Sequence, residues 1–102
     1  MDHATAEYVS QYHYDKAFFG ASAVDAKFGA SAAWEIEGVV KRCVSENTDH
    51  EFLLADHSKF GKKNLMKYGE ISQYEAIFTD DGLDEMQIRD VKKNGGKLMI
   101  CS

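Results

Sequence analysis

Short apolar runs alternate along the chain with segments of helical periodicity, and glycine or polar residues follow most of the runs. The runs are too short for buried helices, and their continuous apolar character is typical of strands buried on both faces. They predict four strands, at residues 17–19, 52–55, 74–79 and 98–101.

Helical spacing of apolar residues occurs between these runs. Ser31 is a favoured N-cap residue, and it is predicted to start the clearest helix, which ends near Asn47. Asp84 and Gln87 form a capping-box pattern that starts another helix, and the Gly95-Gly96 pair ends it. A helix at residues 4–12, a loop at 21–29 and one short helical segment at 64–68 complete the prediction.

The alternation of helices and strands predicts an α/β fold built around a mainly parallel sheet. The carboxyl ends of parallel strands meet at one edge of a sheet, where ligands of such folds bind. Polar residues follow three successive predicted strands, so we expect one site at this edge, formed by Ser22 and Asp25, residues 56–59 and residues 79–81.

Composition narrows the class of protein. A chain of 102 residues accommodates one domain or part of one. Its 44% apolar and 28% charged residues are typical of a soluble folded protein, and no stretch resembles a signal peptide or a membrane span, which predicts a cytoplasmic location. The net charge of −5 disfavours a free-standing nucleic-acid binder, because such binders cluster Lys and Arg.

Metal and cofactor sites are not indicated. Cys43 and Cys101 form no metal or redox spacing, and we expect both to be reduced and buried. The four histidines lack metal-ligand spacing and are expected at the surface. The aspartates at 80–84 do not form a calcium loop, because Val91 occupies the position of the required glutamate.

Three charged residues are candidates for the site, and each has a structural alternative. Lys59 follows a strand, where its ammonium suits a phosphate or a polarised carbonyl, or is simply solvated. Asp25 lies among small residues and can accept hydrogen bonds from ligand hydroxyls or stabilise a turn. The same two roles are open for Asp80.

Five short motifs follow one another along residues 15–101: Asp15 to Ser22, Val24-Asp25 with Gly29, Val40 to Arg42, Leu53 to Gly61, and Thr79 to Leu83. In this order and spacing they resemble the C-terminal effector domain of DeoR-family transcriptional repressors. The resemblance implies a three-layer fold like that of ribose-5-phosphate isomerase, and a sensor of phosphorylated sugars or related metabolites rather than an enzyme. It also implies that Asp25, Lys59 and Asp80 contact the ligand, with Ser22 and Ser31 as further contacts to phosphate or hydroxyl groups.

The family's helix-turn-helix and the glycine-rich first half of its effector domain have no counterpart among these motifs. We therefore expect residues 1–102 to be the C-terminal part of such a domain, reaching DNA only through a domain outside this chain. An uncovered strand edge or apolar face predicts a dimer or larger assembly. Trp34 or the tyrosines at 8, 12 and 14 are the expected contact.

Two other functions stay open at this point. A sugar-phosphate isomerase or deaminase of the same fold would use Asp25 and Asp80 to shuttle protons. A module that only oligomerises would bind no ligand.

Overall fold

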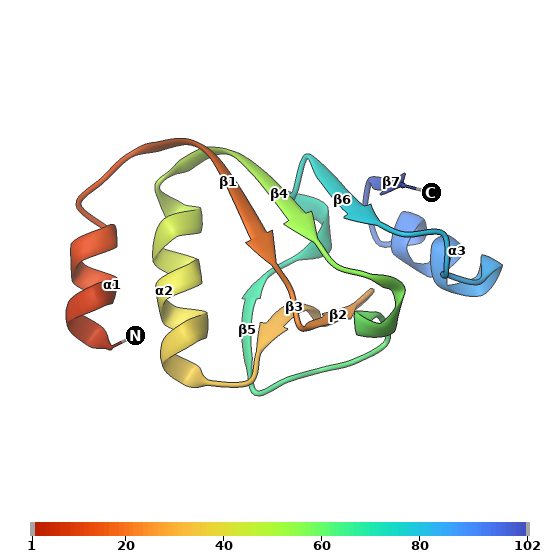
Figure 1. The fold of residues 1–102 in the computed structure, drawn as a ribbon, viewed down its shortest axis with the longest axis horizontal. Coiled ribbons are helices and arrows are strands. Elements are labelled where there is room, and N and C mark those ends of the chain that lie inside the picture. Colours follow the sequence, from red (N-terminus) through yellow and green to blue (C-terminus); the bar gives the residue numbers. More distant parts are fainter. Residues whose placement is uncertain (1, 102) are drawn as a thin grey trace.

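A computed structural model describes residues 2–101 of the chain (Figure 1). Two short 3₁₀ turns, at His57–Lys59 and Ile71–Gln73, accompany the helices and strands. In chain order the helices and strands are α1 (His3–Val9), β1 (Tyr14–Gly20), β2 (Ala23–Asp25), β3 (Gly29–Ala32), α2 (Glu35–Glu46), β4 (Thr48–Leu54), β5 (Met66–Gly69), β6 (Ala76–Thr79), α3 (Glu85–Lys93) and β7 (Leu98–Ile100).

The main sheet has four strands in the order β1-β4-β6-β7, and all of its neighbours pair in parallel. A smaller antiparallel sheet has the order β2-β3-β5. Helices α1 and α2 pack side by side at one end of the molecule, and α3 lies at the other end (Figure 1). The predicted α/β fold with a mainly parallel sheet is thus confirmed.

The core lies on one face of the main sheet. Phe19, Leu53 and Ile77 project from β1, β4 and β6 into it, and each is at most 6% exposed. They meet side chains from the small sheet and from α3, with α2 residues at the margin. Within residues 2–101 these elements cover this face only, and the three-layer arrangement stays a prediction.

The opposite face, here called the outer face, carries Phe18, Phe52, Leu54, Phe78 and Met99. Phe18 is 60% exposed and Leu54 is 42% exposed, so the expectation that both apolar runs are fully buried is wrong for them. Side chains alternate between the two faces of a strand, and these residues have the parity that points away from the core.

Three segments fold differently from their predictions. Ser31 does not cap a helix, because residues 29–32 form the buried strand β3 and α2 begins at Glu35. Residues 66–69 form β5, which pairs with β3, rather than a short helix. The predicted loop at 21–29 also contains β2. In each case pairing with a distant strand overrides the local preference of the segment.

Three helix ends with strong local signals are as predicted: the end of α2 and both ends of α3. Helix α2 ends at the C-cap Asn47, and α3 begins with the capping box of Asp84 and Gln87. Gly95, just after α3, has a φ of +89°, a conformation that favours glycine. No helix within residues 2–101 has the length and apolar character needed to cross a membrane.

Candidate functional site

Two adjoining hollows lie at the carboxyl edge of the main sheet. We call the first the Lys59 hollow; it has a volume of about 410 Å³ and is lined by Gly20, Ala21, Ser22, Leu54, Ala55, Asp56 and Lys59. The second, the Asp80 hollow, has about 250 Å³ and is lined by Ala55, Asp56, Phe78, Thr79, Asp80 and Cys101. Both are open to solvent, and they share Ala55 and Asp56.

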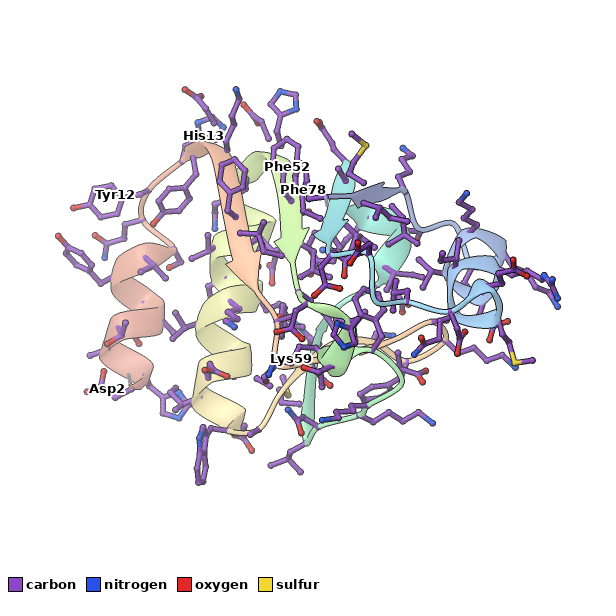
Figure 2. All side chains as sticks on the ribbon, turned by 45° about the vertical axis from the view of Figure 1, so that its right-hand side comes forward. Asp2, Tyr12, His13, Phe52, Lys59 and Phe78 are labelled. Atoms are coloured by element: carbon purple, nitrogen blue, oxygen red, sulfur yellow. The ribbon has the colours of Figure 1, made fainter. Side chains whose placement is uncertain are left out.

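A capped turn positions Lys59. Asp56 follows β4, and its carboxylate accepts hydrogen bonds from the backbone N–H of Ser58, at 2.8 Å, and from the Ser58 hydroxyl. These bonds hold the pKa of Asp56 below its ordinary value. The next residue, Phe60, is 7% exposed and anchors the turn in the core. Lys59 is therefore held, half-buried, between two fixed residues (Figure 2).

Asn64 connects two of the predicted serines. Its side-chain amide donates to the Ser22 hydroxyl at 3.1 Å, and its backbone N–H donates to the Ser31 hydroxyl at 2.8 Å. Ser22 lines the Lys59 hollow, whereas Ser31 is fully buried in β3. The sequence analysis did not select Asn64, because only the folded chain brings residue 64 next to residues 22 and 31.

Asp80 forms an ion pair with His57 across the ends of β6 and β4. The His57 Nδ1 lies 3.0 Å from both carboxylate oxygens of Asp80, and the Gly82 N–H donates to the carboxylate at 3.0 Å. The hydrogen bond to Asp80 raises the pKa of His57, and the same bond lowers the pKa of Asp80. Asp80 is therefore an ionised carboxylate at neutral pH.

Asp25 lies outside both hollows. Its carboxylate accepts the backbone N–H groups of Lys27 and Phe28 at 3.0 and 2.7 Å, which closes the turn between β2 and β3. It lines a separate hollow of about 90 Å³ beside α3. The structure thus brings Ser22 and Lys59 together, places Asp80 in the adjoining hollow, and separates Asp25 and Ser31 from them.

Lys41 is a second cation at this edge that the sequence analysis did not select. Its ammonium reaches back from α2 and donates to the Gly20 carbonyl at 2.9 Å. It also lies 4.9 Å from the centre of the Tyr68 ring, within the range of a cation–π interaction. No local signal in the helical pattern of α2 shows that a long side chain returns to the end of β1.

Two groups of side chains lie close enough together to share a metal ion: His13 with Asp15 and Asp49, and Asp56 with His57 and Asp80. The fold creates both groups from distant segments, so sequence spacing could not show them. His57 and Asp80 already bind one another, and His13 bonds to Asp49 at 3.0 Å. We assign no metal to either group, since both are largely exposed ion pairs.

The cysteines and one larger depression complete the survey. Both cysteines are free thiols, but Cys101 is exposed and Cys43 is half-buried, so the expectation that both are buried is wrong. Cys101 comes just after the edge strand β7, where no further strand covers it within residues 2–101. A depression of about 600 Å³ lies along α3. All of its lining comes from that single helix, and four of the five lining residues are charged: Glu85, Ile88, Arg89, Lys92 and Lys93.

Residues 2–101 form an α/β domain with an open hollow at the carboxyl edge of its parallel sheet. A family model described as the DeoR C terminal sensor domain matches residues 1–81, and the chain belongs to this family. The resemblance of the five motifs is thus confirmed at the level of the family.

Three curated relatives of the chain are named as repressors. The chain is 35% identical over 100 residues to the glycerol-3-phosphate regulon repressor of Haemophilus influenzae, covering 97% of this chain and 38% of that protein. It is 36% identical over 78 residues to the repressor of the same name in Escherichia coli, covering 76% and 31%. It is 31% identical to the HTH-type transcriptional repressor GlcR of Bacillus subtilis, covering 92% and 36%. The chain thus spans about a third of the length of these relatives.

Proposed function

We propose that this chain is the effector-binding part of a bacterial DeoR-family repressor of sugar metabolism and that it binds a phosphorylated sugar in the Lys59 hollow. Membership of the sensor-domain family and the names of the curated relatives support this role. DNA would be bound by a domain outside residues 1–102, because a chain with a net charge of −5 suits phosphate backbones poorly.

The observation that carries the proposal is the pairing of Lys59 with Ser22 in one hollow at the carboxyl edge of the parallel sheet. An ammonium binds phosphate as a compact charge, and Lys41 adds a second positive charge nearby. The carboxylate of Asp56 can accept hydrogen bonds from sugar hydroxyls. The donors and acceptors therefore match a ligand with a phosphate at one end and hydroxyls at the other.

The contacts of the Asp25 and Asp80 carboxylates fit a domain that binds a ligand without catalysing a reaction. A proton shuttle needs a carboxylate that can change protonation near neutral pH. His57 and the Gly82 N–H hold Asp80 in its ionised form, and two backbone N–H groups occupy Asp25 in a separate hollow. These contacts favour a sensor over an isomerase or deaminase.

Calorimetric titration with glucose 6-phosphate, glucosamine 6-phosphate, glycerol 3-phosphate and inorganic phosphate tests the proposal. Lys59→Ala should weaken binding of the best ligand about 10- to 150-fold, the loss expected for a charge-assisted hydrogen bond worth about 1.5–3 kcal/mol. Lys62→Ala is the matched control, because Lys62 is an exposed lysine just beyond the same turn, outside the hollow.

Equal binding by wild type and Lys59→Ala would exclude the Lys59 hollow as the site. Turnover of any of these sugar phosphates that Asp25→Asn abolishes would show that the chain is an enzyme instead.

A further inference from the structure

The two hollows at the carboxyl edge of the main sheet carry opposite charges. Lys59 lines the first hollow, and the ammonium of Lys41 donates to the carbonyl of Gly20, which also lines it. Asp80 lines the second hollow, and Asp56 lines both. A ligand that spans the two hollows therefore meets cations at one end and carboxylates at the other.

The Asp80 hollow lies in a region with an excess of negative charge. The hydrogen bond to Asp80 raises the pKa of His57 most, and the charges of Asp56 and Asp81 add to this effect. Three carboxylates thus act on one imidazole. Even when His57 is protonated, its single positive charge cannot balance all three, so this end of the site attracts a cation.

Each of the two lining carboxylates keeps an oxygen for a ligand. The fold uses Oδ1 of Asp56, which accepts the Ser58 N–H at 2.8 Å and the Ser58 hydroxyl. It also uses Oδ1 of Asp80, which accepts the N–H groups of Gly82 and His57 at 3.0 and 3.3 Å. Among residues 2–101, no group donates to Oδ2 of Asp56, and only the His57 ring bonds to Oδ2 of Asp80. A carboxylate has about four acceptor sites, so both Oδ2 atoms can accept further hydrogen bonds.

An ammonium group suits these acceptors better than a hydroxyl does. A hydroxyl donates one hydrogen bond, whereas an ammonium donates three and carries the opposite charge. Hydrogen bonds between charged groups are roughly twice as strong as neutral ones. The same carboxylates repel a phosphate, which directs the phosphate towards Lys59 and fixes the orientation of the ligand.

We propose that the two hollows form one site for a phosphorylated amino sugar, with the phosphate at Lys59 and the protonated amine at Asp56 and Asp80. The choice of ligand rests on the proposed function, and it narrows phosphorylated sugars in general to those with an amine. His57 competes with the amine for Asp80, because both bring a positive charge to the same carboxylate.

Calorimetric titration of the full chain with glucosamine 6-phosphate and glucose 6-phosphate at neutral pH tests the proposal. These two ligands differ only in an amine or a hydroxyl at one carbon. EDTA in every titration keeps divalent cations away from the carboxylates. The wild type should bind glucosamine 6-phosphate about tenfold more tightly, because a charge-assisted hydrogen bond replaces a weaker one.

Two substitutions should change this preference in opposite directions. Asp80→Asn should lower it to about threefold or less, because the amide has no negative charge, and the affinity for glucose 6-phosphate should not fall. His57→Gln should raise the preference, because the amine then shares Asp80 with no imidazolium. Asp49→Asn is the matched control and should keep the wild-type preference, since Asp49 forms the same kind of exposed ion pair with His13 at the amino edge of the sheet.

The outcomes separate this proposal from the proposed function. Equal affinities for the two ligands, with Lys59→Ala weakening both, would overturn the amine site and leave the function intact. A preference for the amine that Asp80→Asn leaves unchanged would also overturn it, because the amine would then lie outside the Asp80 hollow. If neither ligand binds but glycerol 3-phosphate does, the amine site alone is wrong. If none of the three binds to the folded chain, the proposed function fails as well.

Discussion

Ser31→Ala separates a structural serine from a ligand-binding one. The hydroxyl of Ser31 is fully buried in β3 and accepts the backbone N–H of Asn64 at 2.8 Å. Alanine keeps the small size that this strand needs but leaves that N–H without its acceptor. The substitution therefore tests whether the hydroxyl serves the fold or a ligand.

The expected loss of stability follows from that single bond. Leaving a buried donor unpaired costs about 1–3 kcal/mol of the free energy of unfolding. For a domain of this length, each kcal/mol lowers the melting temperature by about 4–8 °C. Ser10→Ala is the control: Ser10 is exposed after α1, and its hydroxyl donates only to the Glu7 carbonyl. Its effect should stay within about 0.5 kcal/mol.

Calorimetry and urea denaturation, at one protein concentration for both variants, measure these losses. The affinity for the best sugar phosphate should change less in Ser31→Ala than in Lys59→Ala, because Ser31 lies outside the Lys59 hollow. Unchanged stability combined with a loss of affinity would refute the structural role and support the ligand contact predicted from the sequence.

Three further predictions follow from the contacts. Gly29→Ala should lower the free energy of unfolding by about 3 kcal/mol or more in a urea titration. The φ of Gly29 is +99°, and a Cβ atom there would clash with the Gly69 carbonyl oxygen. Tyr68→Phe should raise the melting temperature by a few degrees, because the buried Tyr68 hydroxyl has no hydrogen-bond partner among residues 2–101. The ring protons of His57 should titrate by NMR above its ordinary pKa of 6.5, and Asp80→Asn should return the midpoint towards that value. The ion pair therefore stabilises the fold fully between the ordinary pKa of an aspartate, 3.8, and the ordinary pKa of a histidine, 6.5. This contribution to stability is lost as the pH rises through the raised pKa of His57.

For each of these, one result would contradict the reasoning. A wild-type melting temperature in Gly29→Ala would show that β3 can move away from β5. A destabilised Tyr68→Phe would mean that the hydroxyl has a partner after all. A His57 midpoint that is the same with and without Asp80 would show that the ion pair does not form in solution.

Local signals were enough to predict the elements whose stability is local. The capping box of Asp84 and Gln87 and the terminal glycines define α3 within residues 84–96 of the sequence. The parallel strands were also predictable, because their centres are continuous apolar runs. The predicted ends differ from the observed ones, since β1 and β4 begin with the polar residues Tyr14 and Thr48, which pair with each other across the sheet.

The small sheet was not predictable, because none of its three strands carries a strand pattern of its own. Residues 29–32 consist of glycine, alanine and serine, which give no β signal, and Ser31 suggests a helix cap. They become a strand because β2 and β5 pair with them from both sides. Residues 66–69 adopt their strand for the same reason.

The sequence predicted the edge of the sheet at which the candidate site lies, but not all of the residues that form it. The topological rule for parallel strands selected an edge of the sheet at which Ser22 and Lys59 share a hollow, while ligand binding there stays a prediction. The rule does not distinguish a carboxylate that faces the hollow from one that closes its own turn, as Asp25 does. Nor does it include residues that reach the edge from elsewhere, such as Lys41 on α2 and Asn64 in the loop before β5.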